Sequence, residues 1–278
     1  MEIIAEKING TRKEVGAAVV GRDTAFIQQL ARLQAAAGAT YIDVNAGTGK
    51  TEPEDLVWLT ETVQAAVDLP LCLDSANPAA LGAALPRAAK LPLINSISGE
   101  RSRLEGVLPL VAEYGTPVIA LAADDNGISK ELDRRIEVVR AVIAAIRDAG
   151  VADGLVYVDP LVMPLAGFHQ SGALALAAMR AVKAEFPEVK LAVGLSNLSY
   201  GLPARGLINR VFLAFAVEAG LDAVLVDPND RAVMQELVAA ELVLGRDPFC
   251  RQYTQSYRAG RFGFEGTASA APAPQAQH

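Results

Sequence analysis

Eight short, nearly continuous apolar runs recur along the chain, and each is separated from the next by a segment with helical periodicity. The runs occupy residues 2–5, 41–44, 69–73, 91–94, 117–122, 155–158, 191–195 and 223–226. Runs of this length and composition are typical of parallel strands that are buried on both faces. The segments between them are long enough for the crossover helices that parallel strands require.

Those intervening segments carry the start and stop signals of helices. Asp23 is a candidate N-cap for the first helix, and Gly38 follows its end. Asn77 and Pro78 open the third helix, and Pro86 is expected to end or kink it. Other helices are predicted to begin near residue 53 and to run through residues 104–114, 133–149, 174–186, 209–219 and 231–244.

Strict alternation of eight strands and eight helices predicts an α/β protein with a single domain, a TIM (β/α)8 barrel. An open, doubly wound sheet is the alternative, but no Gly-x-Gly-x-x-Gly follows the first run. With 278 residues, 51% of them hydrophobic, the chain has the size of one such barrel. We assign the barrel to residues 1–262. Residues 263–278 lack apolar periodicity, and a disordered tail is predicted there.

Composition excludes several partners. The net charge is −7 and no Lys/Arg-rich stripe is present, which argues against nucleic acid. No apolar segment approaches the roughly 20 residues that span a bilayer, and residues 1–6 do not resemble a signal peptide. Cys72 and Cys250 lie far apart and form no metal-binding spacing. We therefore expect two reduced thiols in a cytoplasmic protein.

Polar residues follow almost every apolar run. In a barrel of this kind the functional face lies at the carboxyl ends of the strands, so these residues are the candidates for a site. In chain order they are Glu6, Asp43, Asn45, Asp74, Asn95, Ser96, Asp124, Asp125, Asp159, Ser196, Asn197 and Asp227. Acids and amides dominate, and we read Asp124 and Asp125 as part of a plain turn.

This set of residues excludes several chemistries. None of the predicted strands carries the lysine that a Schiff-base aldolase needs. The only histidines are His169 and His278, so no histidine cluster is available for a metal, and we expect no bound metal in this chain. Carboxylates and amides suit a flat, nitrogen-rich heterocycle, because they accept and donate paired hydrogen bonds. A pterin fits this description.

Six short motifs then carry a family resemblance. They are Glu6-Lys7-Ile8-Asn9, Asp43-Val44-Asn45, Cys72-Leu73-Asp74-Ser75, Ile94-Asn95-Ser96, Val158-Asp159-Pro160-Leu161 and Gly194-Leu195-Ser196-Asn197. Together they resemble the methyltetrahydrofolate:corrinoid protein methyltransferases, pterin-binding barrels related to the folate domain of cobalamin-dependent methionine synthase. The resemblance extends from Met1 to about Tyr257, and the order of the motifs is what makes it specific.

The resemblance implies roles for individual residues. Asp74, Asn95 and Asp159 match the family's pterin ligands, and Asn197 matches its catalytic asparagine. Glu6, Gly194, Ser196 and Arg205 are expected at the substrate as well. Tyr200 departs from the pattern, because some members carry a substrate-contacting glutamine there, so that contact is in doubt.

The resemblance also implies a reaction and a partner. The N5-methyl group of 5-methyltetrahydrofolate would move to the Co(I) corrinoid of a partner protein, or a methyl group would move from the methylated corrinoid to tetrahydrofolate. The chain lacks the Asp-x-His-x-x-Gly pattern of corrinoid binding, so the cobalamin is expected on that partner. Family members are often homodimers. The physiological direction, the pathway and the identity of the corrinoid protein stay open.

Two alternatives remain at this point. A dihydropteroate synthase shares the fold, but it carries Asp-Pro-Gly-x-Gly-Phe after strand six and a lysine after strand seven. Here Asp159-Pro160-Leu161-Val162-Met163-Pro164 follows strand six, and residues 198–204 contain no lysine. A non-catalytic folate-binding protein would keep Asp74, Asn95 and Asp159 but would not need Asn197.

Overall fold

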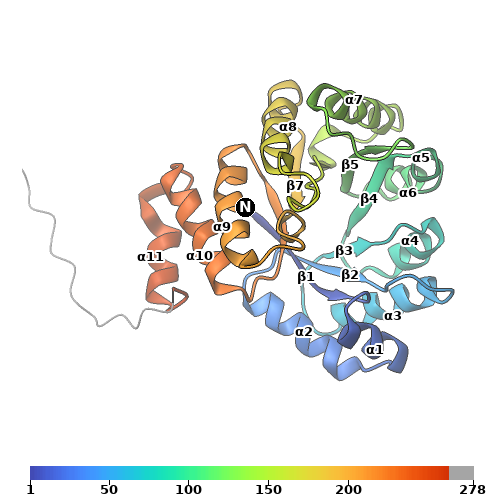
Figure 1. The fold of residues 1–278 in the computed structure, drawn as a ribbon. Helices are drawn as coiled ribbons and strands as arrows, with labels where there is room; N and C mark the ends of the chain where they lie inside the picture. Colours follow the sequence, from blue (N-terminus) through green and yellow to red (C-terminus); the bar gives the residue numbers. More distant parts are fainter. Residues whose placement is uncertain (263–278) are drawn as a thin grey trace, which may run out of the picture.

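Eight parallel strands close into a barrel in the computed structural model, which describes residues 1–262 (Figure 1). Neighbouring strands follow one another in sequence order, and β1 closes the barrel by pairing with β8. The strands are β1 Glu2–Asn9, β2 Tyr41–Asn45, β3 Leu71–Asp74, β4 Leu93–Gly99, β5 Val118–Asp124, β6 Val156–Asp159, β7 Lys190–Gly194 and β8 Ala223–Val226. All eight predicted strands and the TIM-barrel fold are confirmed. The predicted tail, residues 263–278, lies outside the described residues.

Helices surround the barrel (Figure 1). They are α1 Lys13–Gly21, α2 Thr24–Ala36, α3 Glu52–Gln64, α4 Pro78–Ala84, α5 Arg101–Gly106, α6 Leu108–Tyr114, α7 Leu132–Asp148, α8 Ser171–Glu185, α9 Arg205–Glu218, α10 Arg231–Val243 and α11 Arg251–Arg258. Short 3-10 turns, η1 Leu85–Arg87, η2 Asp153–Leu155, η3 Leu195–Asn197 and η4 Pro248–Cys250, complete the described elements. Within residues 1–262, none of the helices combines the length and the apolar character that a membrane crossing needs.

The predicted helix caps are confirmed. The Asp23 side chain accepts a hydrogen bond from the backbone N–H of Phe26, and the Asn77 side chain accepts one from Ala79. At Pro86 the chain passes from α4 into the 3-10 turn η1, as expected.

Three helices differ from the prediction. The expected helix over residues 104–114 is two helices, because Pro109 has no N–H to continue the hydrogen-bond ladder of α5 into α6. Helix α1 was not predicted; it contains two glycines and no side chain caps its start at Arg12. Helix α11 was not predicted either.

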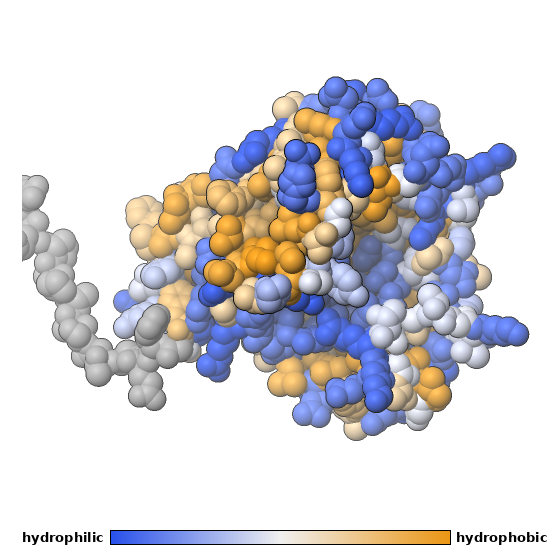
Figure 2. All heavy atoms as spheres, in the orientation of Figure 1, coloured by the Kyte–Doolittle hydropathy of each residue, from blue (hydrophilic) through white to orange (hydrophobic). Residues whose placement is uncertain are grey.

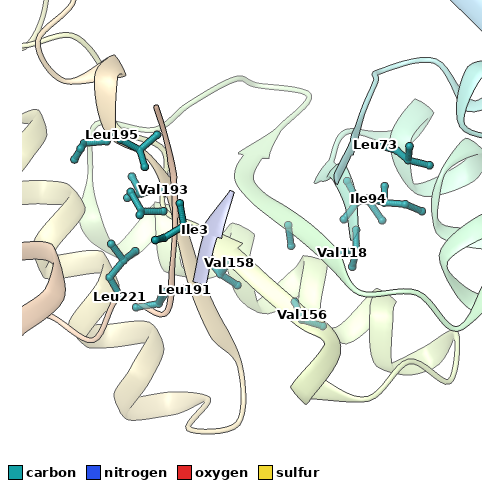
Figure 3. Packing of buried hydrophobic residues seen from close by; sticks show 14 of the residues in the cluster. Ile3, Leu73, Ile94, Val118, Val156, Val158, Leu191, Val193, Leu195 and Leu221 are labelled. Atoms are coloured by element: carbon teal, nitrogen blue, oxygen red, sulfur yellow. The ribbon is translucent and has the colours of Figure 1, made fainter. Parts of the chain in front are cut away.

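Side chains on the strands alternate between two cores. Residues such as Ile3, Leu73, Ile94, Val158 and Val193 lie in the larger cluster, which includes side chains of the surrounding helices (Figure 3). The alternate residues form a separate cluster made only of strand side chains, which is the interior of the barrel: Ile4, Cys72, Leu93, Ile119, Tyr157, Ala192 and Ala223, with Tyr41, Leu121 and Leu225 partly buried against them. The period of two along each strand therefore decides which side chains point into the barrel.

A polar cluster closes the amino-terminal end of this interior. The Tyr157 hydroxyl donates to Glu2 Oε2 at 2.6 Å. The Lys190 ammonium group donates to Glu2 Oε1 at 3.0 Å and to the Tyr157 oxygen at 2.8 Å. Burial and the Glu2 carboxylate raise the pKa of the Tyr157 hydroxyl, so it stays a neutral donor. The floor of the barrel is thus internally satisfied.

Close backbone contact between the first two βα loops gives a test of the fold. The Gly10 N–H donates to the Asn45 carbonyl at 2.7 Å, and a Cβ at Gly10 would lie 2.5 Å from the carbonyl carbon and oxygen of Ala46. Gly10→Ala is expected to lower the free energy of unfolding by about 1–3 kcal/mol, because the obstructing atoms are backbone. Urea denaturation measures this. Gly49→Ala, where no atom lies within 4 Å of the added Cβ, is the control, and equal losses in both variants would contradict the prediction.

Candidate functional site

Five predicted site residues (Glu6, Asp74, Asn95, Asp159 and Gly194), together with Asp43, point into the barrel near the carboxyl ends of their strands, and we call this set of inward positions the polar layer. Each lies two positions after a residue of the barrel interior, so the alternation points it inward at the carboxyl end of its strand. The pairs are Ile4 and Glu6, Tyr41 and Asp43, Cys72 and Asp74, Leu93 and Asn95, Tyr157 and Asp159, and Ala192 and Gly194. The same step gives Leu121 on β5 and Leu225 on β8. Six strands therefore supply polar groups or glycine to this layer and two supply leucine.

Asp74 is held by its neighbour on β2. The Asn45 side-chain amide donates to Asp74 Oδ2 at 2.9 Å, and Asn45 Oδ1 accepts the Gly47 N–H at 2.7 Å. Asn45 is thereby fixed with its amide nitrogen toward the carboxylate. Burial raises the pKa of Asp74, while the Asn45 hydrogen bond and the Arg103 charge oppose that rise. Asp74 Oδ1 makes no hydrogen bond to a side chain within residues 1–262 and can accept one from a ligand.

Asp43 is the most enclosed carboxyl of the layer. It is 2% exposed, and its Oδ1 has no hydrogen-bond partner within residues 1–262. Burial and the neighbouring Asp74 raise its pKa well above the ordinary value, so the neutral acid is favoured. Burial also raises the pKa of the Cys72 thiol next to it. Asp43 and Cys72, which are register partners, thus place two groups with raised pKa values beside Asp74.

Asn95 lies beside Asp74, because these two residues are register partners of β3 and β4. Its carbonyl accepts the Ser75 N–H at 2.9 Å, and the peptide bond to Ser96 is cis. The register of β4 against β5 shifts between Asn95 and Ile97. Asp74 and Asn95, predicted from separate motifs, are thus brought side by side.

Asp159 ends β6, which is separated from β4 by one strand, and is 8% exposed. Its Oδ1 accepts the Leu161 N–H at 2.7 Å. Burial raises its pKa from 3.8 to about 6, against the opposing effects of the Leu161 hydrogen bond and the Arg135 charge. Near neutral pH most of this carboxyl population is ionised.

Asn197 lies at the mouth of the barrel and is exposed. It ends the turn η3, which begins directly after β7. Its amide nitrogen lies 2.8 Å from the position that a Cβ of Gly194 would take. Any larger residue at Gly194 would displace this amide, so the glycine permits the observed position of Asn197.

Arg205 contacts the loop that carries Asn197. Its Nη2 donates to the Ser196 carbonyl at 2.7 Å, and its Nε donates to Ser199 Oγ at 3.0 Å. The guanidinium also lies 5.9 Å from the ring centre of Tyr200. Gly194, Ser196 and Arg205 therefore all shape the surroundings of Asn197, and direct contact of these residues with a substrate stays a prediction.

Glu6 continues the layer on β1. Burial raises its pKa, and Arg12 opposes that rise from 3.6 Å. The expectation that no strand carries a lysine is wrong. Strand β1 runs on to Asn9 and includes Lys7, which pairs with Asp227 at 2.8 Å, and β7 begins at Lys190. Both ammonium groups have carboxylate partners.

Within the described part of the chain, His, Cys, Asp and Glu form no cluster that could hold a metal ion. The polar layer consists of carboxyl oxygens and amides, which form hydrogen bonds and are either neutral or negatively charged. The fold and the site together define a (β/α)8 barrel protein with a cluster of hydrogen-bonding groups at the carboxyl ends of its strands.

Comparison with known proteins narrows this class. The model of the family described as pterin binding enzyme matches residues 7–227. The chain is 36% identical over 266 residues to methylcorrinoid:tetrahydrofolate methyltransferase of Eubacterium limosum, across 95% of this chain and 98% of that protein. This chain belongs to the pterin-binding enzyme family, as the motifs indicated.

Other relatives agree with this assignment. Methionine synthase of Mycobacterium tuberculosis is 30% identical over 264 residues, which are 88% of this chain and 22% of that larger protein. Among solved structures, Yersinia pestis dihydropteroate synthase with a pterine-sulfa conjugate has a TM-score of 0.68 at 22% identity, covering 88% of this chain and 93% of that one. At this identity the structural likeness shows the fold alone.

Sequence reasoning missed two contributors to the site. The sequence shows Asn45 only as one of the polar residues after the second apolar run, and its hydrogen bond to Asp74 depends on a strand pairing that the sequence does not show. Arg135 on α7 was not considered, although it interrupts the apolar stripe formed by Leu132, Ile136 and Val139. An arginine on the buried face of an amphipathic helix is the signal that could have identified it.

The raised pKa of Asp159 predicts a pH-dependent effect of Asp159→Asn on stability. Because the folded state binds this proton more tightly than the unfolded chain, the carboxyl supports folding fully below pH 3.8 and loses that contribution as the pH rises through 6. At 1.36 kcal/mol per pH unit between the two values, the loss approaches about 3 kcal/mol. The asparagine amide does not titrate. The free energy of unfolding of the variant should therefore rise relative to that of wild type as the pH increases from 4 to 8.

Urea denaturation of both proteins at pH 4, 6 and 8 checks this. Any constant cost of the amide cancels, because only the change with pH is compared. A difference between variant and wild type that is the same at all three values would contradict the assignment.

Proposed function

We propose that this protein transfers the N5-methyl group between 5-methyltetrahydrofolate and the Co(I) corrinoid of a partner protein. The observation that carries the proposal is the full-length similarity to a methylcorrinoid:tetrahydrofolate methyltransferase, together with a pterin-binding family match over residues 7–227. The layer of carboxylates and amides at the open end of the barrel supports it from the chemistry of the side chains.

The pterin ring is assigned to Asp74, Asn95 and Asp159. A pterin presents ring and exocyclic N–H donors next to a carbonyl and ring nitrogen acceptors. Asp74, held by Asn45, has an oxygen free to accept N–H groups, and the neighbouring Asn95 amide can both donate and accept. Asp159 joins this pair from β6, two strands further round the barrel than Asn95. The enclosed, neutral Asp43 adds no second negative charge beneath the ring.

Asn197 is assigned the catalytic role. Methyl transfer from N5 leaves a nitrogen that would depart as an anion, and a hydrogen bond or proton at N5 relieves this charge. The Asn197 amide cannot act as a strong acid, but it can hydrogen-bond N5 and stabilise the form that develops in the transition state. Its exposure at the barrel mouth suits a group that meets the methyl donor and acceptor together.

The corrinoid is treated as a substrate that arrives on a partner. The partner approaches and leaves during each cycle, which favours a small interface around the mouth of the barrel. The chemistry at N5 is the same in both directions of transfer. The name of the Eubacterium limosum relative places the methyl group on the corrinoid at the start of that enzyme's reaction.

Two further assignments belong to this proposal. Both cysteines are free thiols, which suits the reducing cytoplasm. A homodimer is supported by an exposed apolar row on α9, made of Leu207, Val211 and Phe215, which follows the helical repeat of four residues. Figure 2 shows apolar side chains gathered over this helix.

Substitution of Asn197 tests the catalytic assignment. Asn197→Ala is expected to lower kcat for methyl transfer from methyltetrahydrofolate to free Co(I) cobalamin by about 10²-fold, the cost of removing one transition-state hydrogen bond of about 3 kcal/mol. Binding of the folate should change far less. Asn126→Ala, at an exposed turn after β5, is the matched control and should keep wild-type turnover.

Wild-type turnover of Asn197→Ala at saturating folate would contradict the catalytic role. The two alternatives give different results in the same assay. A non-catalytic folate-binding protein would bind methyltetrahydrofolate without transferring the methyl group. A dihydropteroate synthase would use a pterin pyrophosphate and p-aminobenzoate and would ignore methyltetrahydrofolate.

The homodimer is tested through the row on α9. Val211→Glu is expected to convert a dimer to a monomer, because it buries an unpaired charge where the two copies would meet. Light scattering coupled to size-exclusion chromatography measures the mass. Val243→Glu, at an exposed valine on α10, is the control. A Val211→Glu protein with the mass of the wild-type dimer would place the interface elsewhere.

A further inference from the structure

Arg135 is a charged side chain in the hydrophobic layer between barrel and helices. It lies on α7, has no exposed surface and is among the largest fully buried side chains. Within residues 1–262 it forms no salt bridge with a carboxylate. Burying a guanidinium in this way is costly unless its donors are satisfied. The partners of its hydrogen bonds therefore indicate which part of the structure Arg135 stabilises.

Every hydrogen bond of the Arg135 side chain goes to a backbone carbonyl in the loop after β5 or the loop after β6. Its Nη1 donates to the carbonyls of Pro160 at 2.8 Å and Leu161 at 2.9 Å. Its Nε and Nη2 both donate to the Ser129 carbonyl, at 3.2 and 2.5 Å. One guanidinium thus joins the loop after β5 to the loop after β6.

The loop after β6 needs such support. Leu161 has a φ of +62°, in the left-handed region that a side chain with a Cβ disfavours. In this conformation its N–H donates to Asp159 Oδ1 at 2.7 Å while its carbonyl accepts from Arg135. The two polar groups of Leu161 therefore connect the guanidinium to the carboxylate.

We propose that Arg135 is a positioning residue for substrate binding, which acts by holding Leu161 in the conformation that orients the Asp159 carboxylate toward the pterin. The proposal rests on the proposed function for the identity of the ligand. Packing alone does not explain the residue, because a methionine on this apolar stripe would fill the space without the desolvation cost. The charge of Arg135 also favours the ionised form of Asp159.

Arg135→Met and Arg135→Lys test whether the Arg135 guanidinium holds Leu161 in place, which we call the clamp. Methionine keeps most of the volume and removes all donors, whereas lysine keeps the charge but cannot reach three carbonyls in a planar fork. Arg140→Met is the matched control: it lies on the same helix, is exposed, and loses a surface pair with Glu185. Far-UV circular dichroism and thermal melting confirm that each variant is folded, and Arg135→Lys serves if Arg135→Met does not fold.

The first readout needs neither folate nor corrinoid. Hydrogen exchange of the Leu161 amide should be at least tenfold faster in both Arg135 variants than in wild type and the Arg140→Met control. By carbon NMR of the side chain, the Asp159 carboxyl should titrate at a higher pH in Arg135→Met, because a nearby positive charge is gone. An equally protected Leu161 amide in a folded variant would overturn the clamp.

The second readout is the reaction. The Kd and KM for methyltetrahydrofolate should rise by at least tenfold in Arg135→Met, with a smaller change in kcat, because the loss affects ground state and transition state alike. Guanidinium ion added to Arg135→Ala should restore part of the affinity. Wild-type affinity in a variant with an exposed Leu161 amide would overturn the positioning role.

These readouts keep the two proposals apart. If wild-type protein neither binds methyltetrahydrofolate nor transfers its methyl group, the proposed function fails. The exchange and titration measurements then still decide whether Arg135 holds Leu161 and Asp159.

Discussion

The two-residue repeat of a strand in a closed barrel is the constraint on which the whole molecule depends. One set of strand residues packs under the helices, and the other set fills the interior. Because the strands run in parallel, the inward residues that follow the interior residues gather at the open end, in the polar layer. That layer is where apolar side chains give way to Glu6, Asp43, Asp74, Asn95 and Asp159. A shift of one residue in any strand would send its site residue into the helical layer.

Burial sets the charge of this layer. Asp43, Asp74 and Asp159 all have raised pKa values, with burial as the leading cause in each case. The effect differs because the supporting contacts differ: Asn45 donates to Asp74 and Leu161 donates to Asp159, whereas one oxygen of Asp43 has no partner within residues 1–262. Three carboxyls of one residue type thus differ in the contacts that oppose the effect of burial on their pKa values. A barrel can therefore vary what it binds through neighbours of the contacting residues, without changing those residues.

Much of the fold followed from the sequence because parallel strands buried on both faces leave an unmistakable run of apolar residues. The candidate site followed for a related reason, since polar residues directly after such runs meet at one end. What did not follow were features that depend on tertiary contact. The break between α5 and α6, the contact of Arg205 with the Ser196 carbonyl, and the path of Arg135 to Pro160 and Leu161 all involve partners that no local pattern specifies. Lys7 was missed because β1 continues beyond its apolar run.

The polar cluster formed by Glu2, Tyr157 and Lys190 closes the amino-terminal end of the barrel and so limits how substrates can reach the site. The interior above this cluster is filled by the side chains of Ile4, Cys72, Leu93 and Ile119, so the site has a single entrance. In the proposed reaction both reactants must use that entrance, and the corrinoid is carried by a partner protein. In either direction of transfer the folate would have to bind first, with N5 facing outward, because a docked corrinoid protein would block the entrance. A barrel that is closed at one end would therefore impose an order of binding on two substrates that share one entrance.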